Sequence, residues 1–210
     1  MSLKFLFIIL AALLIASVGI ISFAAGEGLV DVKILPGTFW YPFKLLWEDI
    51  VTLFTFNDLT LANRYLDLAE ERLAEIKKLE TMKNYEQVKK TLVRYQEKLQ
   101  RAKETIAAAK RAGEDVEGVI NKGVEFVDAN RDTLQGVYNN APDELKRLAK
   151  DTLDKTELSK KDWLNALKNQ MQDQLFNQGK ENNKNLKQLN NDFKEGIVPN
   201  IPNLKNIITQ

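Results

Sequence analysis

The sequence predicts an all-α protein, and three observations lead to this prediction. Apolar residues recur three and four positions apart over residues 59–76 and again over residues 85–109, which is the seven-residue period of packed amphipathic helices. Residues that favour helix ends flank both stretches. No stretch of any length alternates apolar and polar residues with the period of a strand. We expect an N-terminal signal or anchor helix, an antiparallel helical hairpin or bundle with long heptad-patterned helices, and an extended C-terminal tail.

The N-terminal segment predicts export. Lys4 precedes an apolar run over residues 5–21, and Ser22 and Ala24 are small residues at the positions that a signal peptidase reads. Residues 1–24 are therefore either a cleaved signal peptide or an uncleaved membrane anchor, because the run lies at the lower limit for a helix that spans a bilayer. Both interpretations place the remaining chain outside the cytoplasm, either secreted or anchored to the outer face of the cytoplasmic membrane.

A linker over residues 25–33 leads into a segment rich in aromatic side chains. Pro42 favours the first turn of a helix, and the apolar residues that follow it keep helical spacing. Such a group has to be covered by the following helices, by a partner or by the outer membrane leaflet, and packing in the core is the simplest expectation. The alternative is an interaction surface that also includes heptad positions, with the candidate residues Phe39, Trp40, Tyr41, Trp47, Phe54, Leu92, Tyr95 and Leu99.

Two long helices are predicted next. Asn57 or Asp58 caps the first, whose heptad pattern ends near Ile76, and the second runs from Tyr85 to a natural C-cap at Gly113. Because the loop between them is short, the two helices should pack against each other in opposite directions.

A third long helix is predicted from about residue 114 to residue 138. Its apolar pattern is the weakest of the three, and Gly118, Gly123 and Gly136 interrupt it. Each glycine costs roughly 1 kcal/mol against alanine inside a helix, which indicates a close helix approach or a bend. Residues 34–140 are thus expected to form the core of the bundle.

The C-terminal third is expected to be more polar. Residues 141–195 are rich in Asn and Gln and should add a short helix from Pro142 to Lys155 and another that a capping box at Ser159 opens. Two prolines interrupt residues 196–210, which should therefore form the extended tail. Whether the segment from Pro142 onward is a second unit or completes the first bundle stays open.

Composition excludes several classes of chemistry. The chain contains no Cys and no His, which removes thiol nucleophiles, disulfides, the usual zinc sites and Ser-His-Asp triads. Its formal net charge of +1 argues against binding to nucleic acid. Glu70, Glu71 and Glu75 could bind a hard cation or act as a pair of carboxylates, but their mixture with Asp67 and Arg72 is typical of a solvated helix surface. We assign no catalytic residue, no metal ligand and no cofactor.

A series of motifs runs from residue 35 to about residue 110. They are Leu35-Pro36, Tyr41-Pro42-Phe43-Lys44, Trp47-Glu48, Phe54-Thr55-Phe56 and Leu68-Ala69-Glu70-Glu71-Arg72-Leu73-Ala74-Glu75. In this order they resemble a family of exported bacterial and archaeal domains of unknown function. The resemblance implies an extracytoplasmic helical domain, which in some proteins is the outer part of a membrane-bound regulator. It implies no catalytic residues.

Three classes of function remain. The first is a non-enzymatic, extracytoplasmic helical protein of the cell envelope that serves as a protein–protein interaction or scaffold module. The second is a sensory or ligand-binding domain in which Trp40, Trp47 and Tyr41 line an aromatic pocket, and the third is a carboxylate-based enzyme on cell-wall polymers. The expected partners are another protein or a second copy of the chain, and the membrane through residues 5–21 if that run is not cleaved. The sequence identifies no small-molecule ligand.

Overall fold

The computed structural model describes residues 32–177. Within this range the chain forms only α-helices and no strand, which confirms the predicted fold class for the described residues. The predicted signal or anchor segment and the extended tail lie outside them. The helices are α2 (Tyr41–Leu53), α3 (Asp58–Thr81), α4 (Tyr85–Arg111), α5 (Glu117–Asn140) and α6 (Asp143–Asn177).

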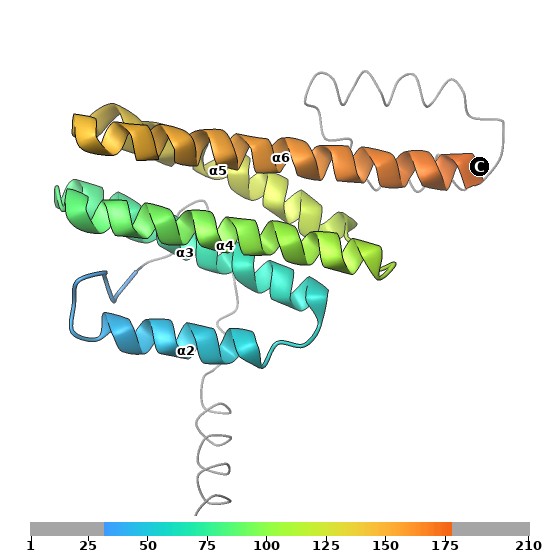
Figure 1. Cartoon of the computed structure of the whole chain (residues 1–210), viewed down its shortest axis with the longest axis horizontal. Coiled ribbons are helices and arrows are strands. Elements are labelled where there is room, and N and C mark those ends of the chain that lie inside the picture. Colours follow the sequence, from blue (N-terminus) through green and yellow to red (C-terminus); the bar gives the residue numbers. More distant parts are fainter. Residues whose placement is uncertain (1–31, 178–210) are drawn as a thin grey trace, which may run out of the picture.

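The helices pack as a bundle with α2 added on one side. Figure 1 shows α3 and α4 side by side and running in opposite directions, as the short loop between them predicted. The helices α5 and α6 cover one side of this pair, and α2 lies on the other side. The backbone of α2 stands farther from its neighbours than the backbones of α3 and α4 stand from each other. Long side chains therefore have to bridge the gap between α2 and the bundle.

One apolar core joins α3, α4, α5 and α6. Leu73 of α3, Leu92 of α4, Ile120 of α5 and Leu167 of α6 are almost completely buried members of the same cluster. Apolar residues of α6 from Leu145 onward belong to this cluster as well. The described part of the chain after residue 140 therefore completes the first bundle and does not form a second unit.

The helix ends follow the sequence signals closely. The side chain of Asn57 accepts a hydrogen bond from the backbone N–H of Thr60 at 2.8 Å, as expected of an N-cap. Gly113, with φ of 82°, ends α4, and the bonds from its N–H and from the next N–H back to the last turn form a Schellman motif. The same motif ends α3, but there Lys83 occupies the left-handed position with φ of 55°.

The structure corrects the expected break in the C-terminal helices. α6 is one continuous helix of 35 residues, and the hydroxyl of Ser159 donates to the carbonyl of Lys155 at 2.9 Å inside it instead of capping a new helix. Thr152 and Thr156 bond in the same way to the carbonyls four residues earlier. Because these hydroxyls are satisfied by their own helix, small polar residues occupy buried positions where the sequence pattern indicated a break.

One of the three glycines of α5 marks a close helix approach. A Cβ atom added to Gly123 would lie 2.8 Å from the ring atom Cζ3 of Trp163 in α6, whereas Gly118 and Gly136 face open space. Gly123 therefore lets the indole ring pack directly on the α5 backbone, and the predicted close approach is confirmed at this position.

Candidate functional site

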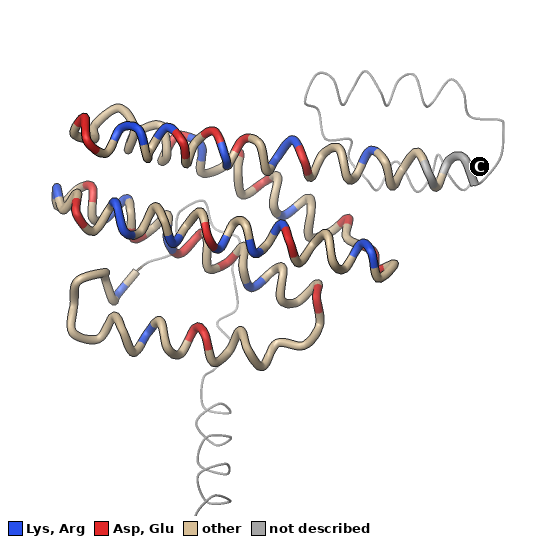
Figure 2. Tube along the Cα trace, in the orientation of Figure 1, with Lys and Arg blue, Asp and Glu red and all other residues tan. Residues whose placement is uncertain are grey.

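The most unusual surface of the described chain is the exposed apolar side of α2. We call it the outer face of α2, and we include in it the exposed aromatic residues that flank the helix at both ends. Its side chains are between 37% and 86% exposed: Phe39, Trp40, Phe43, Leu46, Trp47, Leu53, Phe54 and Phe56. Figure 2 shows charged residues spaced along α3 to α6 and few along α2. The expectation that this aromatic stripe packs in the core is wrong, because the opposite side of α2 faces the bundle.

The inner face of α2 carries polar residues at helical spacing. Tyr41, Lys44 and Glu48 point at α3, where they meet Arg72 and Glu75. The Tyr41 hydroxyl donates to Glu75 at 2.9 Å and accepts a hydrogen bond from Arg72. We call these five residues, together with Glu71, the ion-pair network.

The guanidinium of Arg72 is the centre of the network. It pairs with Glu48 of α2, and its Nη1 lies 3.2 Å from the Oε1 of Glu75. The Nζ of Lys44 reaches Glu75 at 2.5 Å and Glu71 at 2.9 Å. The guanidinium of Arg94, from α4, lies 5.2 Å from the centre of the Tyr41 ring, a distance at which a cation is attracted to the ring face.

Burial governs the protonation of the network. The residues Arg72 and Glu75 are 0% exposed. Burial raises the pKa of Tyr41, which keeps its hydroxyl proton. Burial also raises the pKa of Glu48 and Glu75 against the opposing effect of Arg72. For Arg72 itself, burial lowers the pKa, but the nearby carboxylates of Glu75 and Glu48 more than compensate, and its pKa is raised.

The network fixes the rotation of α2 about its own axis. Removing one partner of a buried ion pair leaves an uncompensated charge and costs about 3–5 kcal/mol. Turning the aromatic stripe toward α3 would withdraw Tyr41, Lys44 and Glu48 from Arg72 and Glu75 at once. The apolar side of α2 is therefore held outward by the polar contacts of its inner face.

The expectation of a solvated carboxylate surface on α3 is corrected by these contacts. Glu75 is fully buried, and Glu71 is largely covered next to Lys44. The network could not be found from a local sequence pattern, because its α2 and α3 residues lie about thirty positions apart, as for Tyr41 and Glu75. A usable signal was the second, polar stripe of α2, which runs along the side opposite its apolar stripe.

The other predicted surface residues do not join the outer face of α2. Leu92, Tyr95 and Leu99 lie in the core, and the Tyr95 hydroxyl is 3.0 Å from that of Thr156 in α6. Their heptad positions are buried because α6 and α3 both pack on α4. They are thus core residues and not an accessible surface.

The aromatic residues proposed to line a pocket point in different directions. Tyr41 is buried against the network, whereas Trp40 and Trp47 lie on the outer face of α2. The Trp40 ring instead contacts Phe39 and Phe43, with ring centres 5.3 Å and 5.6 Å apart. These rings form a surface cluster.

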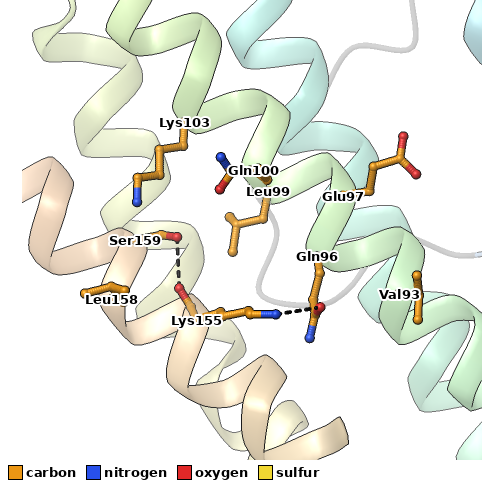
Figure 3. Close-up of a pocket in the computed structure, with 9 residues that line it drawn as sticks. All are labelled: Val93, Gln96, Glu97, Leu99, Gln100, Lys103, Lys155, Leu158 and Ser159. Carbon is orange, nitrogen blue, oxygen red and sulfur yellow. Dashed lines mark hydrogen bonds between the residues drawn. The ribbon is translucent and has the colours of Figure 1, made fainter.

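A groove between α4 and α6 is the second feature that could bind a ligand. It encloses about 490 Å³, and Figure 3 shows Lys103 of α4 and Lys155 of α6 at its edge, with Leu99 between the helices. Both lysines are already paired, since Lys155 lies 2.8 Å from Asp151 and Lys103 pairs with Asp162. A second hollow of about 440 Å³ lies farther along the same helix pair and is lined in part by Trp163.

Comparison with known proteins gives a family match for part of the chain. Residues 33–126 match the family described as a domain of unknown function (DUF5667). This finding confirms the resemblance inferred from the motifs. No curated protein and no solved structure was found to match the chain.

The DUF5667 match covers the whole of the site on α2. It includes α2, α3 and α4 and ends within α5. All six residues of the ion-pair network belong to the motifs that carried the resemblance in the sequence: Tyr41, Lys44, Glu48, Glu71, Arg72 and Glu75. These six motif residues therefore have a structural explanation, because they attach α2 to α3 in one orientation.

Two negative findings apply to the described residues alone. Within residues 32–177, no group of three or more acidic side chains is placed to hold a metal ion. No helix of that part of the chain has the length and apolar composition needed to cross a membrane.

Proposed function

We propose that this chain is a non-enzymatic interaction or scaffold module of the cell envelope, located outside the cytoplasm, and that the outer face of α2 is the surface through which it docks. The observation that carries the proposal is the combination of an exposed aromatic helix face with a buried network that holds it outward. Soluble monomers rarely expose contiguous apolar patches of this kind unless they bind something.

Cysteine labelling in the producing cells tests this proposal. Because the chain has no native cysteine, Leu46→Cys and Leu158→Cys each introduce a single thiol. The two leucines are similarly exposed, at 58% and 53%, but only Leu46 lies on the outer face of α2. Intact cells are treated with a maleimide that does not cross the cytoplasmic membrane, and the labelled fraction of each variant is measured.

We expect the thiol at position 158 to react and the thiol at position 46 to be protected. Equal labelling of the two positions in intact cells would show that the outer face of α2 is unoccupied and would overturn the proposal. Labelling of both positions only after lysis would place the chain in the cytoplasm and would overturn the proposed location.

A sensory or ligand-binding domain is the second candidate, and the α4–α6 groove supports it. Pockets for small molecules commonly enclose about 300–1,000 Å³, and the groove falls within this range. Trp163 lines the adjoining hollow and is a natural reporter. Its emission, isolated by Trp40→Phe and Trp47→Phe, should shift when a metabolite or peptidoglycan fragment binds. A flat response across a broad panel would exclude this candidate.

A further inference from the structure

We infer that the outer face of α2 lies on the surface of a lipid bilayer, with its aromatic side chains at the level of the headgroups. This inference rests on the proposed function and names the partner of the docking surface. Three properties of the face carry it: its side-chain composition, its distance along the chain from the apolar run at residues 5–21, and the pairing of the charges on α2.

The composition of the face matches a helix that lies in a membrane interface. Such helices place Trp, Phe and Leu on the buried side and keep polar residues on the other. Trp40 and Trp47 combine an apolar ring with an N–H group that suits the boundary between headgroups and acyl chains. Trp40, Phe39 and Phe43 form one cluster of rings at the start of α2. The contacts of the inner face leave this cluster free to face a flat partner.

The chain brings this face close to the apolar run at residues 5–21. The structure attaches the chain to the bundle at Val32, whose carbonyl accepts a hydrogen bond from the Nζ of Lys78 at 2.9 Å. Residues 22–31 separate the run from this point and span at most about 35 Å when fully extended. As an uncleaved anchor, which is one of the two interpretations of its sequence, the run would hold α2 near the lipid surface. Such tethering raises the effective concentration of the face at the membrane.

The charges of α2 indicate that the outer face would bind the membrane through apolar contacts and not through contacts with charged headgroups. The helix has three charged residues, and Lys44 and Glu48 belong to the network while Asp49 lies 4.0 Å from Lys98. No cluster of unpaired basic side chains accompanies the apolar stripe of α2, in contrast to segments that bind anionic headgroups. Binding should therefore be equally strong on zwitterionic and on anionic lipid.

The test is fluorescence quenching on vesicles that contain the full chain. The Leu46→Cys and Leu158→Cys variants are labelled with an environment-sensitive dye and reconstituted into vesicles of phosphatidylcholine, with or without phosphatidylglycerol. A fraction of the lipid carries a spin-label quencher on the acyl chain close to the headgroup. The dye at position 46 should lose most of its emission and shift to the blue, whereas the dye at position 158 should keep its emission.

A matched variant distinguishes the contribution of the outer face from that of the membrane-embedded run at residues 5–21. Phe39→Ser combined with Phe43→Ser changes the face but leaves the network and residues 5–21 unchanged, and it should reduce the quenching at position 46 in the same vesicles. Circular dichroism verifies that this variant keeps its helix content.

The remaining outcomes would overturn the inference. Emission at position 46 that matches position 158 would show that the face is in water. A dye at position 46 whose emission shifts to the blue but is not quenched by the labelled lipid would show that a protein, such as a second copy of the chain, covers the face. This last result would refute the assignment to lipid but would leave the proposed docking surface intact, so the two failures are distinguishable.

Discussion

Replacing Arg72 by leucine should release α2 from the bundle while the other helices stay folded. The guanidinium of Arg72 pairs with Glu48 and Glu75 and bonds to the Tyr41 hydroxyl. Its removal leaves two buried carboxylates without their main partner, which costs about 3–5 kcal/mol. Because α2 adds little apolar area to the core, detaching α2 relieves this cost and full unfolding is not required.

Hydrogen exchange measured peptide by peptide gives the magnitude. Since 1.4 kcal/mol corresponds to a factor of ten, a cost of about 3–5 kcal/mol means that the amides of α2 should lose roughly 2 to 3.5 orders of magnitude of protection in the Arg72→Leu variant. The amides of α4 should keep theirs. The control is Lys122→Leu, which removes a pair with Asp67 at 2.6 Å whose side chains are 41% and 36% exposed. A surface pair of this kind contributes about 0–1 kcal/mol, so protection should hardly change.

Two results would refute this reasoning. Unchanged protection of α2 would mean that the network does not hold it, and an equal loss across α2 and α4 would mean that α2 is an integral part of the cooperative core. Tyr41→Phe is a second variant, on α2 itself. It removes the hydroxyl between Glu75 and Arg72 and should weaken the protection of α2 in the same direction, by about 1–3 kcal/mol.

Three further predictions concern stability, measured by urea unfolding. Gly136→Ala should raise the unfolding free energy by up to about 1 kcal/mol and serves as the control. Gly123→Ala should be about 1–3 kcal/mol less stable than this control, because its Cβ overlaps Trp163. Equal unfolding free energies of the two variants would contradict the close packing of Trp163 on α5. Lys83→Gly should stabilise the chain by about 0.5–1 kcal/mol, since Lys83 has a positive φ, and a loss would argue against that conformation. Burial raises the pKa of Tyr95 and of Tyr41, so both side chains ionise first in the unfolded chain. The unfolding free energy should therefore fall above about pH 10, by up to about 1.4 kcal/mol per pH unit for each of the two. Tyr95→Phe should make this decline less steep, and an unchanged slope would exclude a contribution from Tyr95.

The sequence was most informative about the long, strongly periodic helices. α3 and α4 were predicted, together with the start of α3 at Asn57 and the end of α4 at Gly113, because apolar spacing and cap residues agree there. The break expected near Ser159 did not occur, since a buried hydroxyl that bonds its own helix looks like a polar interruption in the sequence.

The orientation of α2 could not be read from its own residues. An apolar stripe shows that a helix has two different sides, but it does not state which side faces the bundle. The answer depends on Arg72 and Glu75, which lie in another helix and offer charged partners to the polar stripe. Leu92 and Leu99 show the same limit, since their heptad spacing fits both a core and an interface and only the position of α6 decides for the core.

Because α2 is attached to the bundle through one side alone, its two sides are under different constraints when the sequence changes. A change at Tyr41 or Glu48 disturbs partners on α3 and has to be matched there. A change at Phe43 or Leu46 alters only what the protein presents to its surroundings, because these side chains point outward. Chains that share this architecture can therefore change the side chains of the outer face while the bundle and its network stay the same.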